Sequence, residues 1–125
     1  MFRDSFDKYL SENGLENIDK NETIIIEILE TVKKLVLEPR THISWSIFDT
    51  KDELIIEIDA HIQKLKLRDF SKIKDLILLF APTSDFQEIS LSSGWSNNYL
   101  NLSERFDIAI RGLCEKFQLK PFFGN

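Results

Sequence analysis

The stretch from Trp95 to Phe117 most strongly constrains how this chain can fold. Large apolar residues recur there in steps of three or four: Trp95, Tyr99, Leu102, Phe106, Ile110, Leu113 and Phe117. Because an α-helix turns once in about 3.6 residues, this spacing places them on one helix face. Further apolar or small residues lie beside this stripe: Leu100, Ile108, Ala109 and Cys114. A helix with so apolar a face is predicted to pack against the rest of the chain.

The size and composition indicate one globular domain over residues 1–125. A chain of 125 residues is long enough for a single hydrophobic core. An apolar fraction of 42% argues against disorder, and 4 glycines and 3 prolines favour long regular elements. The net charge of −5 gives no electrostatic reason to expect binding to nucleic acid or to an anionic membrane.

The single cysteine and the apolar runs bear on the cellular location. Cys114 is the only cysteine, so an internal disulfide is excluded, and its place beside the apolar stripe predicts a buried, unreactive thiol. The first residues lack the apolar core of a secretion signal. The longest apolar run, Leu76–Ala81, is too short to span a bilayer. We therefore expect a cytosolic protein.

Two helices are predicted in the N-terminal third. Apolar residues at helical spacing indicate a short helix over about Arg3–Asn13, which Gly14 would end. A second helix begins near Asp19 or Asn21 and ends before Pro39. Its predicted buried face consists of Ile25, Ile28, Leu29, Val32, Leu35 and Val36.

The period of the pattern then changes to two, which predicts a β-hairpin. Apolar and polar residues alternate over 43–47 and again over 54–62, on either side of a four-residue loop at 49–52. The register that keeps the apolar residues on one face pairs Trp45 with Ile56 and places His42 across from Asp59.

Two further strands are predicted at Leu76–Phe80 and Phe86–Ser92, the second with Ile89 and Leu91 pointing inward. The expected fold is therefore α+β: an antiparallel β-meander of about four strands, with two N-terminal helices and a long C-terminal helix packed on one face. The C-terminal stripe is expected to pack on four residues of the sheet: Trp45, Ile56, Ile58 and Leu78.

One group of residues has the chemistry of a metal or acid–base site. In the predicted register, His42, Asp59 and His61 share the polar face of the hairpin with Glu57, and imidazole and carboxylate groups are zinc ligands and proton carriers. The usual metal-ligand spacings are missing. A solvated sheet face with a weak His42–Asp59 pair is therefore favoured, with no metal and no cofactor.

The sequence favours a small, acidic, non-enzymatic binding protein. One form of this function is an inhibitor or immunity-type protein that neutralises a basic partner such as a nuclease toxin. Its predicted partner-binding residues are carboxylates on the proposed strands: Glu53, Glu57, Asp59 and Glu88. One alternative is a metal-binding or hydrolytic enzyme that uses His42, Asp59 and His61. Another is a subunit that forms a homodimer through the open face or edge of its sheet.

Overall fold

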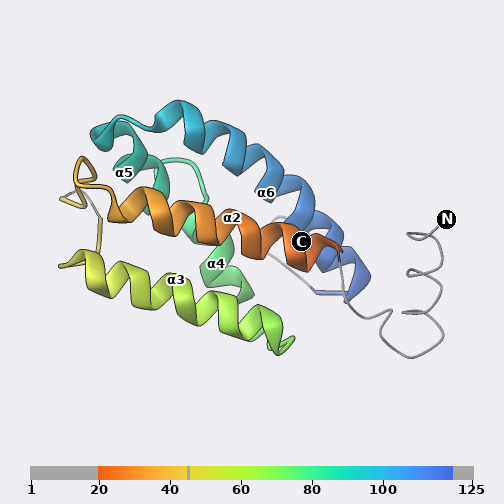
Figure 1. The fold of residues 1–125 in the computed structure, drawn as a ribbon. Helices are drawn as coiled ribbons and strands as arrows, with labels where there is room; N and C mark the ends of the chain where they lie inside the picture. Colours follow the sequence, from red (N-terminus) through yellow and green to blue (C-terminus); the bar gives the residue numbers. More distant parts are fainter. Residues whose placement is uncertain (1–19, 45, 120–125) are drawn as a thin grey trace, which may run out of the picture.

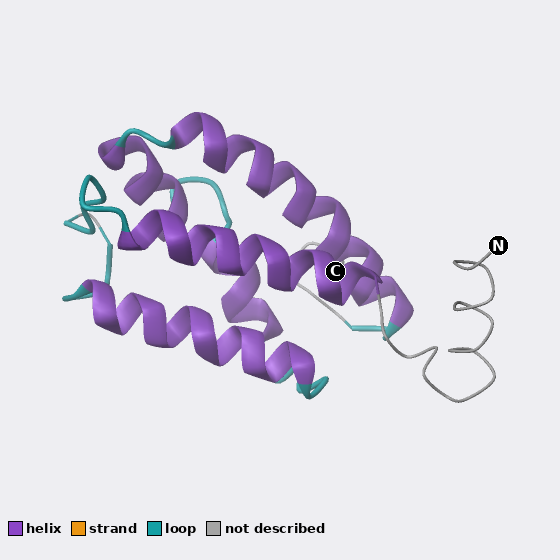
Figure 2. Cartoon of the chain, in the orientation of Figure 1, coloured by secondary structure: helices purple, strands orange, loops and turns teal. Residues whose placement is uncertain are grey.

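The computed structural model describes residues 20–44 and 46–119, and every regular element in them is an α-helix. The helices are α2 (Lys20–Leu37), α3 (Lys51–Lys66), α4 (Ile73–Leu79), α5 (Asp85–Ser93) and α6 (Ser96–Lys116). Figure 2 shows these helices joined by loops, with no strand among the described residues. The helix predicted at Arg3–Asn13 lies outside the described residues.

Two predicted long helices, one in the N-terminal third and one near the C-terminal end, are confirmed. Helix α2 ends two residues before Pro39, and all six residues of its predicted inner face are buried. Helix α6 carries the predicted stripe, with Trp95 and Phe117 as the residues that cap its two ends. All members of the stripe are buried except Phe117, which is partly buried. Cys114 is buried and unpaired as expected, and burial raises the pKa of its thiol. The 3.6-residue period therefore located both helices correctly.

Helix α2 forms the centre of the bundle. It lies between α6 and α3 and runs antiparallel to both, while α4 and α5 lie behind it in the view of Figure 1. Helices α2 and α6 approach closely near Gly112, where an added Cβ atom would lie 2.5 Å from Nδ2 of Asn21. The main core therefore forms along α2, which packs on both of the other long helices.

The predicted α+β fold is wrong, and the hairpin region shows why. Residues 51–66 form α3, whose buried apolar residues are Leu54, Ile58, Ile62 and Leu65. This helix begins at Thr50, whose hydroxyl accepts a hydrogen bond of 3.1 Å from the Glu53 amide. Residues spaced by four fit both an alternating strand and one helix face, so the alternation did not exclude a helix.

The strands predicted at Leu76–Phe80 and Phe86–Ser92 are also helical. The first segment belongs to α4, which buries Ile77 and Leu79 but leaves Leu78 50% exposed. The second belongs to α5, which buries Phe86 and Ile89 and leaves Leu91 57% exposed. Gly94, with a φ of 85°, ends α5 in a left-handed conformation that suits glycine.

The residues that the C-terminal helix was expected to pack on do not form one buried surface. Ile58 belongs to the core, but Ile56 is 67% exposed and Leu78 is half exposed. Trp45 lies outside the described residues. The pairing of Trp45 with Ile56 and of His42 with Asp59 depended on a sheet, and Asp59 lies on a helix instead.

Polar contacts attach the loop after α2 to the end of α5 and to the start of α6. The indole nitrogen of Trp95 donates to the Thr41 hydroxyl over 2.9 Å, and that hydroxyl donates to the Leu35 carbonyl over 2.6 Å. The His42 amide donates to Ser93 Oγ over 2.7 Å. These bonds fix the end of α5 against the end of α2.

Within residues 20–44 and 46–119, no helix combines the length and hydropathy needed to cross a membrane.

Candidate functional site: a groove between α4, α5 and α6

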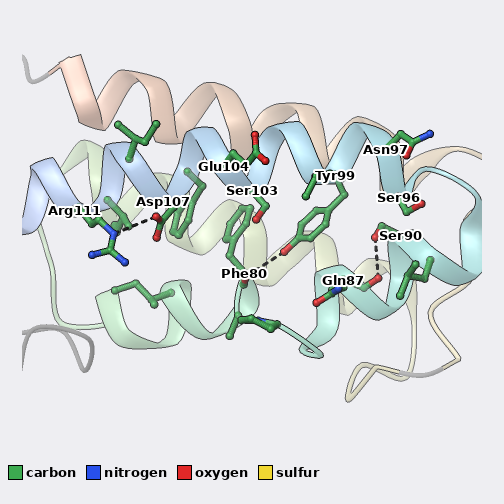
Figure 3. A pocket seen from close by; sticks show the side chains of 18 residues that line it. Phe80, Gln87, Ser90, Ser96, Asn97, Tyr99, Ser103, Glu104, Asp107 and Arg111 are labelled. Carbon is green, nitrogen blue, oxygen red and sulfur yellow. Dashed lines mark hydrogen bonds and ion pairs between the residues drawn. The ribbon is translucent and has the colours of Figure 1, made fainter.

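An open groove of about 930 Å³ runs along α6, between this helix and the α4–α5 pair. Figure 3 shows its lining, with α6 on one side and α4 and α5 on the other. Helix α6 contributes most of the lining residues, from Ser96 at one end to Arg111 at the other. The groove therefore follows the length of the helix and is too open to be an enclosed ligand cavity.

Aromatic rings form the floor of the groove. The Phe80 ring stacks on the Phe106 ring with 3.9 Å between centroids, and Phe86 packs edge-on against Phe80 at 4.9 Å. Figure 3 shows the Tyr99 ring beside Phe80, where the phenol donates a 3.2 Å hydrogen bond to the Phe80 carbonyl. Burial raises the pKa of Tyr99, so its phenol stays protonated and remains a donor.

The rim carries large aliphatic side chains that the fold leaves in solvent. Leu91 on α5 is 57% exposed, while Leu100 and Ile108 on α6 are 60% and 73% exposed. An isolated exposed aliphatic side chain is ordinary on a protein surface, but three such side chains around one groove make an apolar patch. Such patches are typical of protein-binding surfaces.

The charged residues of the rim lie along the middle and second half of α6. Arg111 Nε donates to Asp107 Oδ2 over 3.1 Å, and both side chains are more than half exposed. Glu104 is also exposed, and within the described part of the chain it has no hydrogen bond or ion pair. Since Asp107 and Arg111 offset each other, the lining has a net negative charge located at Glu104.

The structure does not assemble the predicted metal or acid–base group. His42 lies exposed in the loop before α3, while Asp59 and His61 are two residues apart on α3 and point to different sides of that helix. Asp59 pairs with Lys33 at 2.8 Å, and the buried His61 pairs with Glu57 at 2.9 Å. Among the described residues, no three His, Cys, Asp or Glu side chains lie close enough to hold a metal ion.

The four carboxylates predicted to bind a partner do not share one face. Glu53 and Glu57 are one turn apart on α3, where the Glu53 carboxylate accepts from the Asp49 amide over 3.0 Å. Asp59 projects to another side of α3, and Glu88 lies on α5. Two of these side chains are engaged in the ion pairs described above, so they are not four independent charges on one surface.

Sequence reasoning missed the groove, although part of its signal was present. Leu100 and Ile108 stand beside the buried stripe of α6, where a strictly amphipathic helix would carry polar residues. The predicted strand places Leu91 on its inner face, which conceals the exposure of this residue.

Comparison of the chain with protein-family models, curated proteins and solved structures finds no match.

Proposed function

We propose that this protein is a non-enzymatic binding protein that docks an apolar segment of a basic protein partner in the groove along α6. The observation that carries the proposal is the exposure of Leu91, Leu100 and Ile108 around an aromatic floor. Exposed apolar side chains that gather on one surface mark protein-interaction sites, where a partner removes them from water. Burying such a side chain contributes about 1.5–3 kcal/mol.

The net charge of −5 supports a basic partner. Opposite charge on two proteins speeds their encounter, and a rim that carries Glu104 favours a positive group beside it. The specific form proposed is a cytosolic inhibitor or immunity-type protein that neutralises a basic toxin such as a nuclease. In this proposal Glu53, Glu57, Asp59 and Glu88 contribute to the long-range negative field, and the groove supplies the contact.

Charge reversal on α3 would be an ambiguous test of this steering. Glu57 holds the buried His61, and Asp59 pairs with Lys33 of α2, so lysine at either position would also disturb the bundle. The dependence of the association rate on salt tests the steering without any substitution. The Debye length falls from about 10 Å at 0.1 M to about 3 Å at 1 M, so the rate should fall over that range.

The docking function is tested by a matched pair of variants. Leu100→Lys places a charge on the groove rim, whereas Ile56→Lys makes an equivalent change on α3, across α2 from α6. Proteins of the source cell are captured on each variant, identified and then measured individually. We expect a basic protein that binds the wild type and Ile56→Lys equally, and Leu100→Lys at least about tenfold more weakly. Equal binding to all three proteins would contradict docking in the groove.

A further inference from the structure

The outer rim of α6 carries an apolar–acidic–apolar row. Leu100, Glu104 and Ile108 follow one another in steps of four, so they lie along one side of the helix about 6 Å apart. All three are exposed, and Leu91 on α5 adds an apolar side chain to the opposite wall. A partner that covers all three positions therefore matches them best with two apolar groups about 12 Å apart and, between them, a group that pairs with a carboxylate.

The shape of the groove favours a helix over an extended segment. A strand binds by adding to a sheet edge, and the described residues contain no sheet. A proline-rich segment needs exposed aromatic faces, but Phe80, Tyr99 and Phe106 are at least 90% buried. An amphipathic helix needs only an apolar groove and contacts it through residues three, four and seven apart. The groove spans Ser96 to Arg111, which is about 22 Å of helix.

Building on the docking function above, we propose that the groove binds one amphipathic α-helix of the partner, with a lysine or arginine that pairs with Glu104. Its apolar residues, one turn before and one turn after this base, pack on Leu100 and Ile108. The charge complementarity comes from Glu104, which has no partner within the described residues, while Asp107 is already paired with Arg111. Glu104 is therefore the residue that selects for basic helices, and the aliphatic row supplies most of the affinity.

A displayed library of helical peptides about 16 residues long tests this assignment. Each peptide carries two fixed leucines two turns apart, and the residues between them are randomised. The full-length chain is the target, beside Glu104→Lys, Leu100→Lys and a control, Glu27→Lys, on the exposed side of α2. We expect the wild type and Glu27→Lys to enrich lysine or arginine midway between the leucines, and Glu104→Lys to enrich aspartate or glutamate there.

Binding constants of the enriched peptides then separate the possible failures. Glu104→Gln should weaken a basic peptide by no more than about fivefold, as for an exposed ion pair, and Leu100→Lys by at least about tenfold. If Leu100→Lys abolishes binding but basic and acidic peptides bind alike, the role of Glu104 is overturned and docking in the groove stands. If no peptide distinguishes the wild type from Leu100→Lys, both proposals fail. Self-association of the wild type that Leu100→Lys removes would assign the groove to a second copy of the chain.

Discussion

The two sides of α6 carry similar apolar residues but have opposite surroundings. On the inner side, Leu102, Phe106 and Leu113 are buried in the core. On the outer side, Leu100 and Ile108 stand in solvent above the groove. A hydrophobic residue stabilises the fold only when the fold itself removes it from water, so the same helix can supply both core packing and a binding surface.

The largest expected effect comes from the inner side. Phe106→Ala should lower the free energy of unfolding by about 3–5 kcal/mol, because it removes a buried ring that stacks on Phe80 and leaves empty space at the floor of the groove. Urea unfolding followed by circular dichroism measures the loss, with Ile108→Ala as the control on the same helix. A loss under about 1 kcal/mol for Phe106→Ala would show that the stripe is not the core face.

The helices that could be predicted from sequence are those with long periodic patterns. Helix α2 spans 18 residues and α6 spans 21, which gives five or more turns over which a 3.6-residue period can be recognised. Their apolar faces also continue without interruption to clear end signals such as Pro39. Over such lengths a strand and a helix would bury clearly different sets of residues, so the apolar positions distinguish the two structures.

The shorter segments were ambiguous in physical terms. Helices α4 and α5 span 7 and 9 residues, so an apolar run in them fits a strand as well as a helix. In α3 the isoleucines favour a strand by local propensity, but packing Leu54, Ile58 and Ile62 against α2 decides for a helix. Thr50 and Glu53 have the spacing of a capping box, and this signal of a helix start was interpreted as a hairpin loop.

The candidate site was even less accessible to sequence reasoning than the fold. The groove depends on how α4 and α5 lie against α6, and both were assigned as strands. Phe80 forms its floor only because a helix ends there and its carbonyl accepts from Tyr99. Sequence spacing along one helix could therefore find Leu100 and Ile108, but not the opposite wall.

A smaller effect is expected where the start of α6 is anchored. Thr41→Val removes a buried hydroxyl that accepts from the Trp95 indole and donates to the Leu35 carbonyl. The indole N–H then has no acceptor in the core, so stability should fall by about 1–3 kcal/mol. Thr41→Ser keeps the hydroxyl and is the control in the same unfolding measurement. A loss in Thr41→Ser with none in Thr41→Val would mean that the methyl group, and not the hydrogen bonds, is what matters.

The loop between α3 and α4, which packs on the end of α6, should respond to acid. Asp69 accepts from the Ser71 hydroxyl and amide and pairs with Lys64, and these contacts lower its pKa from 3.8 to about 2. Because the folded pKa is the lower one, this stabilisation is present above about pH 4 and is lost as the pH falls toward 2. The next residue, Phe70, packs on Phe117 at the end of α6.

Comparing Asp69→Asn with the wild type from pH 6 to pH 2 tests this prediction. The wild type should be the more stable protein at the upper end of the range. The difference should shrink as the pH falls from about 4 toward 2, because the unfolded chain binds the proton at a higher pH than the folded protein does. The effect should be small, because this side chain is exposed and solvent screens its charge. A difference that stays constant down to pH 2 would mean that the charge of Asp69 contributes nothing.

The smallest effect on folding is expected on the outer side of α6. Leu100→Ala should change the free energy of unfolding by no more than about 0.5 kcal/mol, because the leucine is 60% exposed and alanine suits a helix equally well. The same substitution should weaken partner binding, since a docked helix would bury this side chain. Unfolding and binding measured on Leu100→Ala and Leu113→Ala together show whether the two roles separate, because Leu113 is buried and does not line the groove. An unfolding loss above about 1 kcal/mol for Leu100→Ala would place this leucine in the core, and the two sides of α6 would then not differ in kind.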